Sequence, residues 1–119
     1  MIGTARKGLD VSITGLGCKV PDRVVTNDEL SQLVDTSNEW IMERTGIRER
    51  RIAGPEEALS DLALPAARDA LAQAWWAGSD SDRLIVATVT PDMAFPSTAA
   101  ILADALGAVD AAAYDLCAG

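Results

Sequence analysis

The sequence predicts an α/β fold with a mixed, mainly parallel sheet. Segments rich in β-branched residues alternate along the chain with segments in which apolar residues recur at helical spacing, and this order is typical of α/β proteins. Residues 83–90 form a nearly continuous apolar run, as strands do when both faces of a parallel sheet are covered. With 49% hydrophobic residues in a length of 119, the chain has enough apolar mass for one core.

The first predicted element is a strand over residues 11–17, where apolar and polar residues alternate. A glycine-marked turn is expected at its end, and Pro21 closes the segment. Gly15 and Gly17 also have the spacing that opens a dinucleotide-binding fingerprint. However, Val20 holds the position of the third glycine and Pro21 blocks an immediate helix, so the glycine turn is the better interpretation.

Two short helices are expected next. Thr26 and Glu29 have the spacing of a capping box, which predicts a helix start. A second helix, capped by Ser37 or Asp35, is expected to stop near Gly46.

After a connecting loop over residues 48–55, four further elements complete the predicted alternation. Leucine and alanine at helical spacing predict the first of them, in which Pro65 is tolerable only in the first turns. Two buried strands then flank an alanine- and leucine-rich helix. In order, the elements are a helix from Ser60 to before Gly78, a strand over 83–90, a helix from Ser97 or Thr98 to Gly107, and a strand over 111–117.

Residues 35–51 combine a tryptophan with four arginines, in a chain that has 10 basic and 18 acidic residues. In a helix, Trp40 and Arg44 lie four residues apart on one face, where they can approach a flat ligand together. Arginine suits phosphate and stacks on planar rings, so the segment favours a small phosphorylated ligand over a nucleic acid. The alternative is that Trp40 packs into the core and Arg44 is a solvated helix residue. The remaining arginines are Arg48, Arg50 and Arg51.

The composition excludes several kinds of site. The chain has no histidine, so it can assemble neither a hydrolase triad nor the usual zinc patterns. Cys18 and Cys117 make no disulfide framework and are expected to be reduced. For Cys117 an activated thiol at a strand-to-helix turn is the alternative, but a small buried hydrophobe is favoured for both cysteines. No secretory signal and no apolar stretch of about 20 residues is found, which predicts a soluble, intracellular protein.

The last predicted strand leads into a run of small apolar residues. Residues 111–119 have no polar tail, whereas the ends of domains usually lie at the surface. We therefore expect residues 1–119 to be a fragment of a larger domain, or one of two pieces that form it.

Taken together, these residues resemble the β-ketoacyl-acyl carrier protein synthase III enzymes of the thiolase fold. The resemblance covers nearly the whole chain. The matching stretches are specific when they occur together in this order, although no single stretch is specific by itself. It implies a thiolase-like layered fold, of which this chain would form the amino-terminal half only. The matching stretches are residues 21–27, 34–41, 44–50, 85–88, 94–97 and 114–116.

The resemblance implies roles for four residues. The tryptophan that matches Trp40 stacks on the adenine of coenzyme A (CoA), and the arginine that matches Arg44 lies beside that ring or its phosphates. Thr36 matches another position near the nucleotide. The phenylalanine that matches Phe95 reaches across a homodimer interface and limits the partner's acyl pocket, which implies a short acyl primer such as acetyl.

The family's nucleophile is a cysteine in a motif that begins with aspartate. Residues 115–119 fill this motif up to, but excluding, that cysteine, so the resemblance implies a nucleophile directly after Gly119. Cys117 matches the variable position and receives no catalytic role. The family's catalytic histidine and asparagine would also follow, and no catalytic residue is expected within this chain.

The function implied by the resemblance is the initiating condensation of fatty acid synthesis in the cytoplasm. An acyl group passes from acyl-CoA to a cysteine thiolate, and the thioester then condenses with malonyl-acyl carrier protein. CoA is a substrate; no permanent cofactor, metal, nucleic acid or membrane partner is expected, and this chain alone would be inactive without the rest of the enzyme. The alternatives are a secondary-metabolite condensing enzyme that uses CoA and a non-catalytic CoA-binding half.

Overall fold

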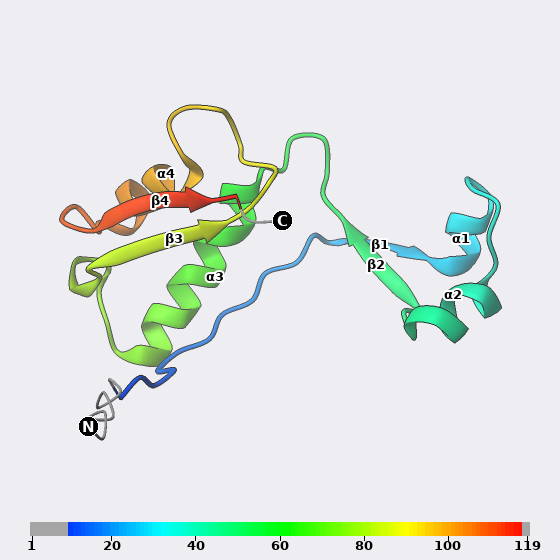
Figure 1. Ribbon diagram of the computed structural model, residues 1–119, viewed down its shortest axis with the longest axis horizontal. Coiled ribbons are helices and arrows are strands. Elements are labelled where there is room, and N and C mark those ends of the chain that lie inside the picture. Colours follow the sequence, from blue (N-terminus) through cyan, green and yellow to red (C-terminus); the bar gives the residue numbers. More distant parts are fainter. Residues whose placement is uncertain (1–9, 118–119) are drawn as a thin grey trace, which may run out of the picture.

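The computed structural model describes residues 10–117, which form two groups of elements (Figure 1). One group contains a small antiparallel sheet and two short helices, and the other contains a parallel strand pair and two longer helices. Figure 1 shows the groups lying side by side along the longest axis, joined by residues 10–22 and 53–58. The α/β class is therefore as predicted, with its antiparallel and parallel strands divided between two separate sheets.

The first group is built on a hairpin-like pair of strands. Strand β1 (Arg23–Thr26) pairs antiparallel with β2 (Glu49–Ile52), so that Val25 lies opposite Arg50. Helices α1 (Asn27–Ser31) and α2 (Asn38–Thr45) occupy the chain between the two strands. The predicted helix start is confirmed, because the Thr26 hydroxyl accepts the Glu29 N–H at 3.2 Å.

The loop predicted over residues 48–55 is wrong, since four of its residues form β2. Three of the four side chains of this strand are charged, and β1 is only four residues long, so neither strand has the apolar alternation that sequence patterns depend on. Their pairing depends on contacts between segments more than twenty residues apart. A short, charged strand of this kind carries no local signal.

The second group follows the predicted order of elements. Helix α3 (Leu59–Ala74) is followed by a short 3-10 turn (Gly78–Asp80), β3 (Arg83–Ala87), α4 (Thr98–Leu106) and β4 (Ala112–Leu116). Strands β3 and β4 are parallel. Ser97 caps α4, and Gly107 ends it at φ 73°. Ala58 precedes α3, where Asp61 accepts the N–H of Ala58 at 2.9 Å.

The predicted strand over residues 11–17 is wrong, because this segment has no ladder partner among the described residues. It runs instead against α3, and the Leu16 N–H donates to the side-chain oxygen of Gln73 at 3.2 Å. A Cβ added to Gly15 would lie 2.0 Å from the carbonyl oxygen of Ala70. A Cβ added to Gly17 would lie 1.8 Å from the carbonyl oxygen of Ala66. The two glycines therefore allow this segment to pack closely against α3, and they do not form the predicted turn.

Replacement of Gly17 by alanine is expected to lower the free energy of unfolding by about 1–3 kcal/mol, because the methyl group must push the segment away from α3. Gly54→Ala is a matched control, since a Cβ there meets no atom within 4 Å. Urea denaturation of the complete protein measures both. Equal stability of the two variants would contradict the close packing.

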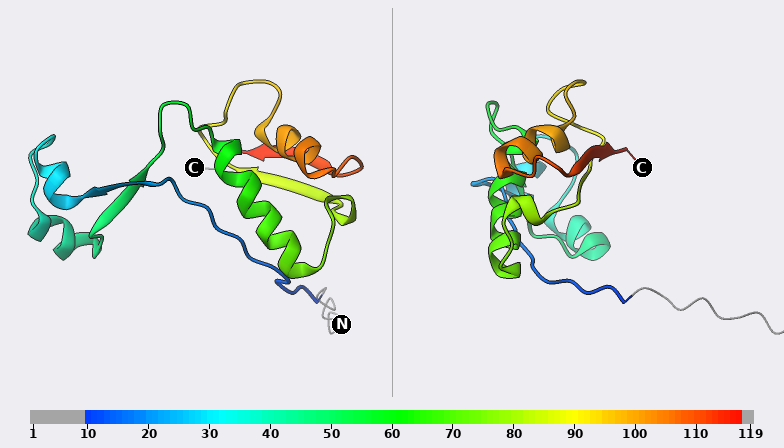
Figure 2. Two further views of the ribbon diagram at one scale, coloured as in Figure 1. Left: turned by 180° about the vertical axis from the view of Figure 1, so that it is seen from behind. Right: turned by 90° about the vertical axis from the view of Figure 1, so that its left-hand side faces the viewer.

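Within residues 10–117, only one face of the two strands that were predicted to be buried on both faces is covered. Helices α3 and α4 lie on the same side of the β3–β4 pair (Figures 1 and 2). Leu84 and Val86 are half-buried on that side, whereas Ile85 and Tyr114 on the other face are 48% and 43% exposed. The apolar run therefore indicated a strand correctly but not its burial. The residues that are buried as a hydrophobic core are Val25, Ile41, Ala99, Leu102, Ala103 and Ala108.

Candidate functional site

Helix α2 is a short helix with well-defined ends. The Ser37 hydroxyl accepts the N–H of Trp40 at 3.2 Å, so Ser37, rather than Asp35, is the cap. At the other end Gly46 adopts φ 68°, a left-handed conformation in which its N–H donates to the Met42 carbonyl. These two caps confirm the predicted helix and fix which side chains share a face.

Trp40 and Arg44 form a stacked pair on this helix. The guanidinium carbon of Arg44 lies 4.7 Å from the centre of the Trp40 ring, which is a cation–π distance. Trp40 is 53% exposed. The interpretation in which Trp40 packs into the core is therefore wrong, and the pair presents a flat aromatic surface and a positive charge to solvent.

A surface hollow of about 400 Å³ lies beside the pair. Its lining consists of Asp35, Thr36, Ser37 and Trp40. The hydroxyl oxygen of Thr36 is buried and has no hydrogen-bond partner among residues 10–117. Buried polar atoms in native proteins are nearly always paired, so an unpaired hydroxyl in the wall of a hollow is a feature of ligand sites.

Glu39 lies in the first turn of the same helix. Hydrogen bonding by its own backbone N–H, and then by the Ser37 hydroxyl, holds the pKa of this carboxyl below its usual range. A group with a lowered pKa stabilises the fold above the ordinary carboxyl pKa, and this contribution is lost as the pH falls through the lowered value. The start of α2 is therefore best ordered with Glu39 ionised, close to neutral pH.

The four arginines of residues 35–51 fall into two pairs with different surroundings. Arg50 donates to the Val25 carbonyl at 3.2 Å and to the Asn27 side-chain oxygen at 2.6 Å. Arg51 donates to the backbone carbonyls of residues 21 and 22. These two guanidinium groups stabilise the pairing of β1 with β2, a role that the sequence did not indicate. Arg44 and Arg48 remain exposed.

Phe95 lies in the other group of elements, in the loop between β3 and α4, and is 88% exposed. Figures 1 and 2 show this loop above the ends of β3 and β4, well away from α2. The structure therefore brings Thr36, Trp40 and Arg44 together and leaves Phe95 apart from them. An exposed aromatic ring on a loop is suited to a contact between molecules.

Two aspartates, for which the sequence predicted no contact with a helix, connect the strand ends with the helix starts. The Asp115 carboxylate accepts the N–H groups of Thr98 and Ala99 at 2.9 and 2.8 Å. The Thr98 hydroxyl accepts the N–H of Asp92, whose carboxylate accepts the N–H of Ser60 at 3.1 Å. A clue was present in Asp115, a lone carboxylate within an apolar strand.

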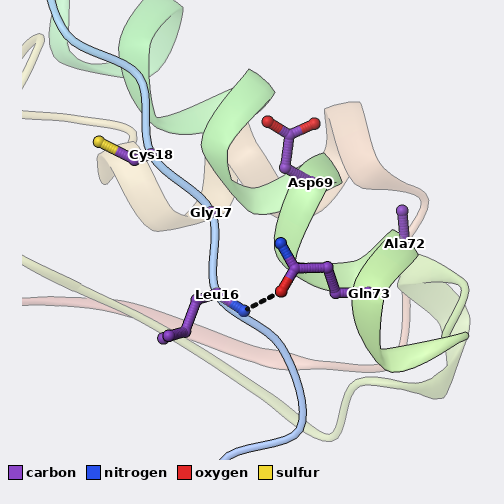
Figure 3. Close-up of a pocket in the computed structure, with 6 residues that line it drawn as sticks. All are labelled: Leu16, Gly17, Cys18, Asp69, Ala72 and Gln73. Carbon is purple, nitrogen blue, oxygen red and sulfur yellow. Dashed lines mark hydrogen bonds between the residues drawn. The ribbon is translucent and has the colours of Figure 1, made fainter.

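A larger hollow of about 490 Å³ lies where the segment before β1 crosses α3 (Figure 3). In Figure 3 the side chain of Gln73 reaches toward this segment, whereas those of Leu16 and Cys18 point away from the helix. Both Cys18 and Cys117 are exposed free thiols, so the favoured interpretation of buried cysteines is wrong. Cys117 lies just beyond β4, on whose second face Tyr114 is exposed.

The described part of the chain has neither a candidate metal site nor a helix that could cross a membrane. Residues 10–117 contain no group of three or more candidate metal-ligating side chains. Within the same range, no helix combines the length and the apolar character needed to cross a membrane.

Known proteins that are similar to this chain share one name. A scan against models of protein families finds no match. The chain is 62% identical over 108 residues to the β-ketoacyl-[acyl-carrier-protein] synthase III of Symbiobacterium thermophilum, a match that covers 91% of this chain and 33% of that protein. It is 55% identical over 106 residues to the synthase of the same name from Solibacter usitatus, covering 89% of this chain and 32% of that protein.

Solved structures agree with the sequence comparison. The crystal structure of 3-oxoacyl-[acyl-carrier-protein] synthase III from Aquifex aeolicus matches with a TM-score of 0.82 and 45% identity, over 87% of this chain and 33% of that one. The priming β-ketosynthase of the R1128 polyketide pathway matches with a TM-score of 0.83 and 36% identity, over 92% and 34%. The fold is thus that of the thiolase-type condensing enzymes.

Over the matched residues, the chain is similar in sequence and in fold to β-ketoacyl-acyl carrier protein synthase III enzymes. It spans about one third of the length of the curated relatives that it matches. The resemblance inferred from the sequence is confirmed.

Proposed function

We propose that this chain supplies the acyl-CoA-binding surface of a condensing enzyme that initiates fatty acid synthesis. The observation that carries the proposal is the exposed Trp40–Arg44 pair beside the hollow that holds the unpaired Thr36 hydroxyl. An adenine ring needs a flat aromatic surface, and its phosphates need a cation. Both lie here within one helical turn.

The geometry supports the following arrangement of the nucleotide. At 4.7 Å from the ring centre, the Arg44 guanidinium occupies one face of the indole and leaves no room for a second ring between them. The adenine therefore stacks on the other face of Trp40, while Arg44 directs its N–H groups to phosphate oxygens. The Thr36 hydroxyl supplies a hydrogen bond at the base of the hollow.

The proposed reaction begins with the thioester held at this surface. A cysteine thiolate attacks the thioester carbonyl, CoA leaves as a thiolate, and the acyl group remains on the cysteine. Loss of carbon dioxide from malonyl-acyl carrier protein then gives a carbanion that attacks the acyl-cysteine, which releases the thiolate and forms 3-oxoacyl-acyl carrier protein. We expect the cysteine to be the residue after Gly119, so this chain alone is inactive.

The same proposal assigns Phe95 to a homodimer interface, where its ring would limit the partner's acyl pocket to a short primer such as acetyl. Its exposure of 88% supports a contact outside its own chain. CoA serves as a substrate and no resident cofactor is required. We expect a cytoplasmic enzyme whose other partner is malonyl-acyl carrier protein.

A second candidate function is the priming condensation of a secondary-metabolite pathway. The likeness to the priming β-ketosynthase of the R1128 polyketide pathway favours it. The two candidates share the nucleotide site and differ in the acyl donor. A non-catalytic CoA-binding half is the third candidate, and any residue other than cysteine after Gly119 would favour it.

Incubation of the complete protein with acetyl-CoA, followed by mass spectrometry of its peptides, tests the proposed chemistry. We expect one acetyl group on a cysteine that follows Gly119. An acetyl group on Cys117 would contradict the motif assignment. Absence of any adduct in a folded protein would favour the non-catalytic candidate.

A further inference from the structure

Helix α2 must be held firmly if Trp40 and Arg44 are to meet a nucleotide, a condition that rests on the function proposed above. The helix has only eight residues and a single buried side chain, that of Ile41. Isolated helices of this length are unstable in water. Something outside the helix must therefore hold both of its ends.

Asn27 touches both ends of α2 with one amide group. Its side-chain nitrogen donates to the side-chain oxygen of Asn38 at 3.0 Å and to the carbonyl oxygen of Ile47 at 2.9 Å. Asn38 is the first residue of α2, and Ile47 directly follows the cap Gly46. Asn27 itself is only 1% exposed, so these bonds are shielded from water.

Arg50 sets the orientation of this amide. Its guanidinium donates at 2.6 Å to the Asn27 side-chain oxygen and at 3.2 Å to the Val25 carbonyl. A flipped amide would turn its NH₂ group toward the cation, where no acceptor exists. The arginine therefore keeps the oxygen toward β2 and both N–H groups toward α2.

We propose that Asn27, oriented by Arg50, is the positioning residue of the nucleotide site. It does not line the hollow formed by residues 35–37 and Trp40. It acts by fixing where α2 begins and where it ends, and so where Trp40 and Arg44 stand relative to Thr36. A helix displaced by even one ångström would separate the stacking surface from the hydroxyl.

The position requires an amide, because one group must donate on one side and accept on the other. In Asn27→Asp the carboxylate still accepts from Arg50 but cannot donate, so its second oxygen faces the backbone carbonyl oxygen of Ile47 without a proton between them. This substitution therefore releases α2 while it keeps the bond to β2. Gln32→Glu makes the same chemical change at an exposed position in the C-cap of α1 and is the matched control.

In the complete protein, Asn27→Asp is expected to raise the KM for acetyl-CoA about tenfold and to leave kcat at saturating substrate within about twofold. The KM for acetyl-pantetheine, which lacks the nucleotide, and that for malonyl-acyl carrier protein should stay unchanged. Gln32→Glu should match the unsubstituted protein in all four values. An unchanged KM for acetyl-CoA would overturn the proposal.

Hydrogen exchange supplies a readout that does not depend on the ligand. In Asn27→Asp the amides of residues 41–46 should exchange faster, while those of α3 and α4 keep their rates. Equal acceleration in all helices would overturn the proposal, because Asn27 would then act on overall stability. If Asn27→Asp fails to fold, Asn38→Ala removes only the first of the two bonds and should show the same local acceleration.

The same variants distinguish the positioning role of Asn27 from the nucleotide site itself. If Asn27→Asp loosens α2 but neither it nor Trp40→Ala changes the KM for acetyl-CoA, the nucleotide site is wrong. If Trp40→Ala raises this KM and Asn27→Asp does not, the site stands and Asn27 does not position it.

Discussion

Trp40→Ala in the complete protein is expected to raise the KM for acetyl-CoA about 5- to 100-fold, with little change in kcat at saturating substrate. Stacking of a base on an aromatic side chain contributes about 1–3 kcal/mol, and this contribution is the same in the ground state and the transition state. Because Trp40 is 53% exposed, its removal should leave the free energy of unfolding nearly unchanged. Steady-state kinetics with acetyl-CoA as the varied substrate measure the effect.

Trp76→Ala is a matched control for this experiment. Trp76 is 52% exposed, almost the same as Trp40, but it lies beyond the end of α3. Its removal should leave the KM for acetyl-CoA unchanged. Similar effects of the two substitutions would show that loss of a surface tryptophan, rather than loss of a nucleotide contact, is being measured.

Asp115→Ala is expected to lower the free energy of unfolding by about 2–4 kcal/mol. The carboxylate accepts the N–H groups of Thr98 and Ala99 at 2.9 and 2.8 Å, and its removal leaves both without a partner at the start of α4. Hydrogen bonds to a charged group contribute about 1.5–3 kcal/mol each, and the half-buried position moderates the sum. Urea denaturation of the complete protein gives the value.

Asp104 supplies the control for Asp115. It is exposed in the last turn of α4, where a negative charge is unfavourable beside the helix carbonyls. Asp104→Ala should therefore change the free energy of unfolding by less than about 0.5 kcal/mol, or raise it slightly. A loss for Asp115→Ala no larger than that for Asp104→Ala would contradict the proposed connection between β4 and α4.

Local signals in the sequence predicted the helices well. Ser37, Ser97, Gly46 and Gly107 mark helix ends, and each occupies that place in the structure. Capping depends on a side chain and a backbone group three residues apart, so a local pattern is sufficient to find it. The stacked pair was predictable for the same reason, since Trp40 and Arg44 are neighbours on one helical turn.

Features that depend on distant partners were not predictable. Alternation over residues 11–17 indicated a strand, but the segment contacts α3, and only Gly15 and Gly17 hint at that approach. The charged strand β2 is recognisable only beside β1. Asn27 and Arg50 lie 23 residues apart, and no spacing rule relates them. Their contact forms only when β1 pairs with β2.

Trp40, Arg44 and Thr36 are proposed to hold the nucleotide of acyl-CoA. The most direct test compares kcat/KM for acetyl-CoA and for acetyl-pantetheine, which carries the same reactive thioester without the nucleotide. We expect the unsubstituted complete protein to prefer acetyl-CoA strongly. In Trp40→Ala this preference should fall by about the same factor by which the KM for acetyl-CoA rises. A preference that stays the same in Trp40→Ala and Arg44→Ala would contradict it.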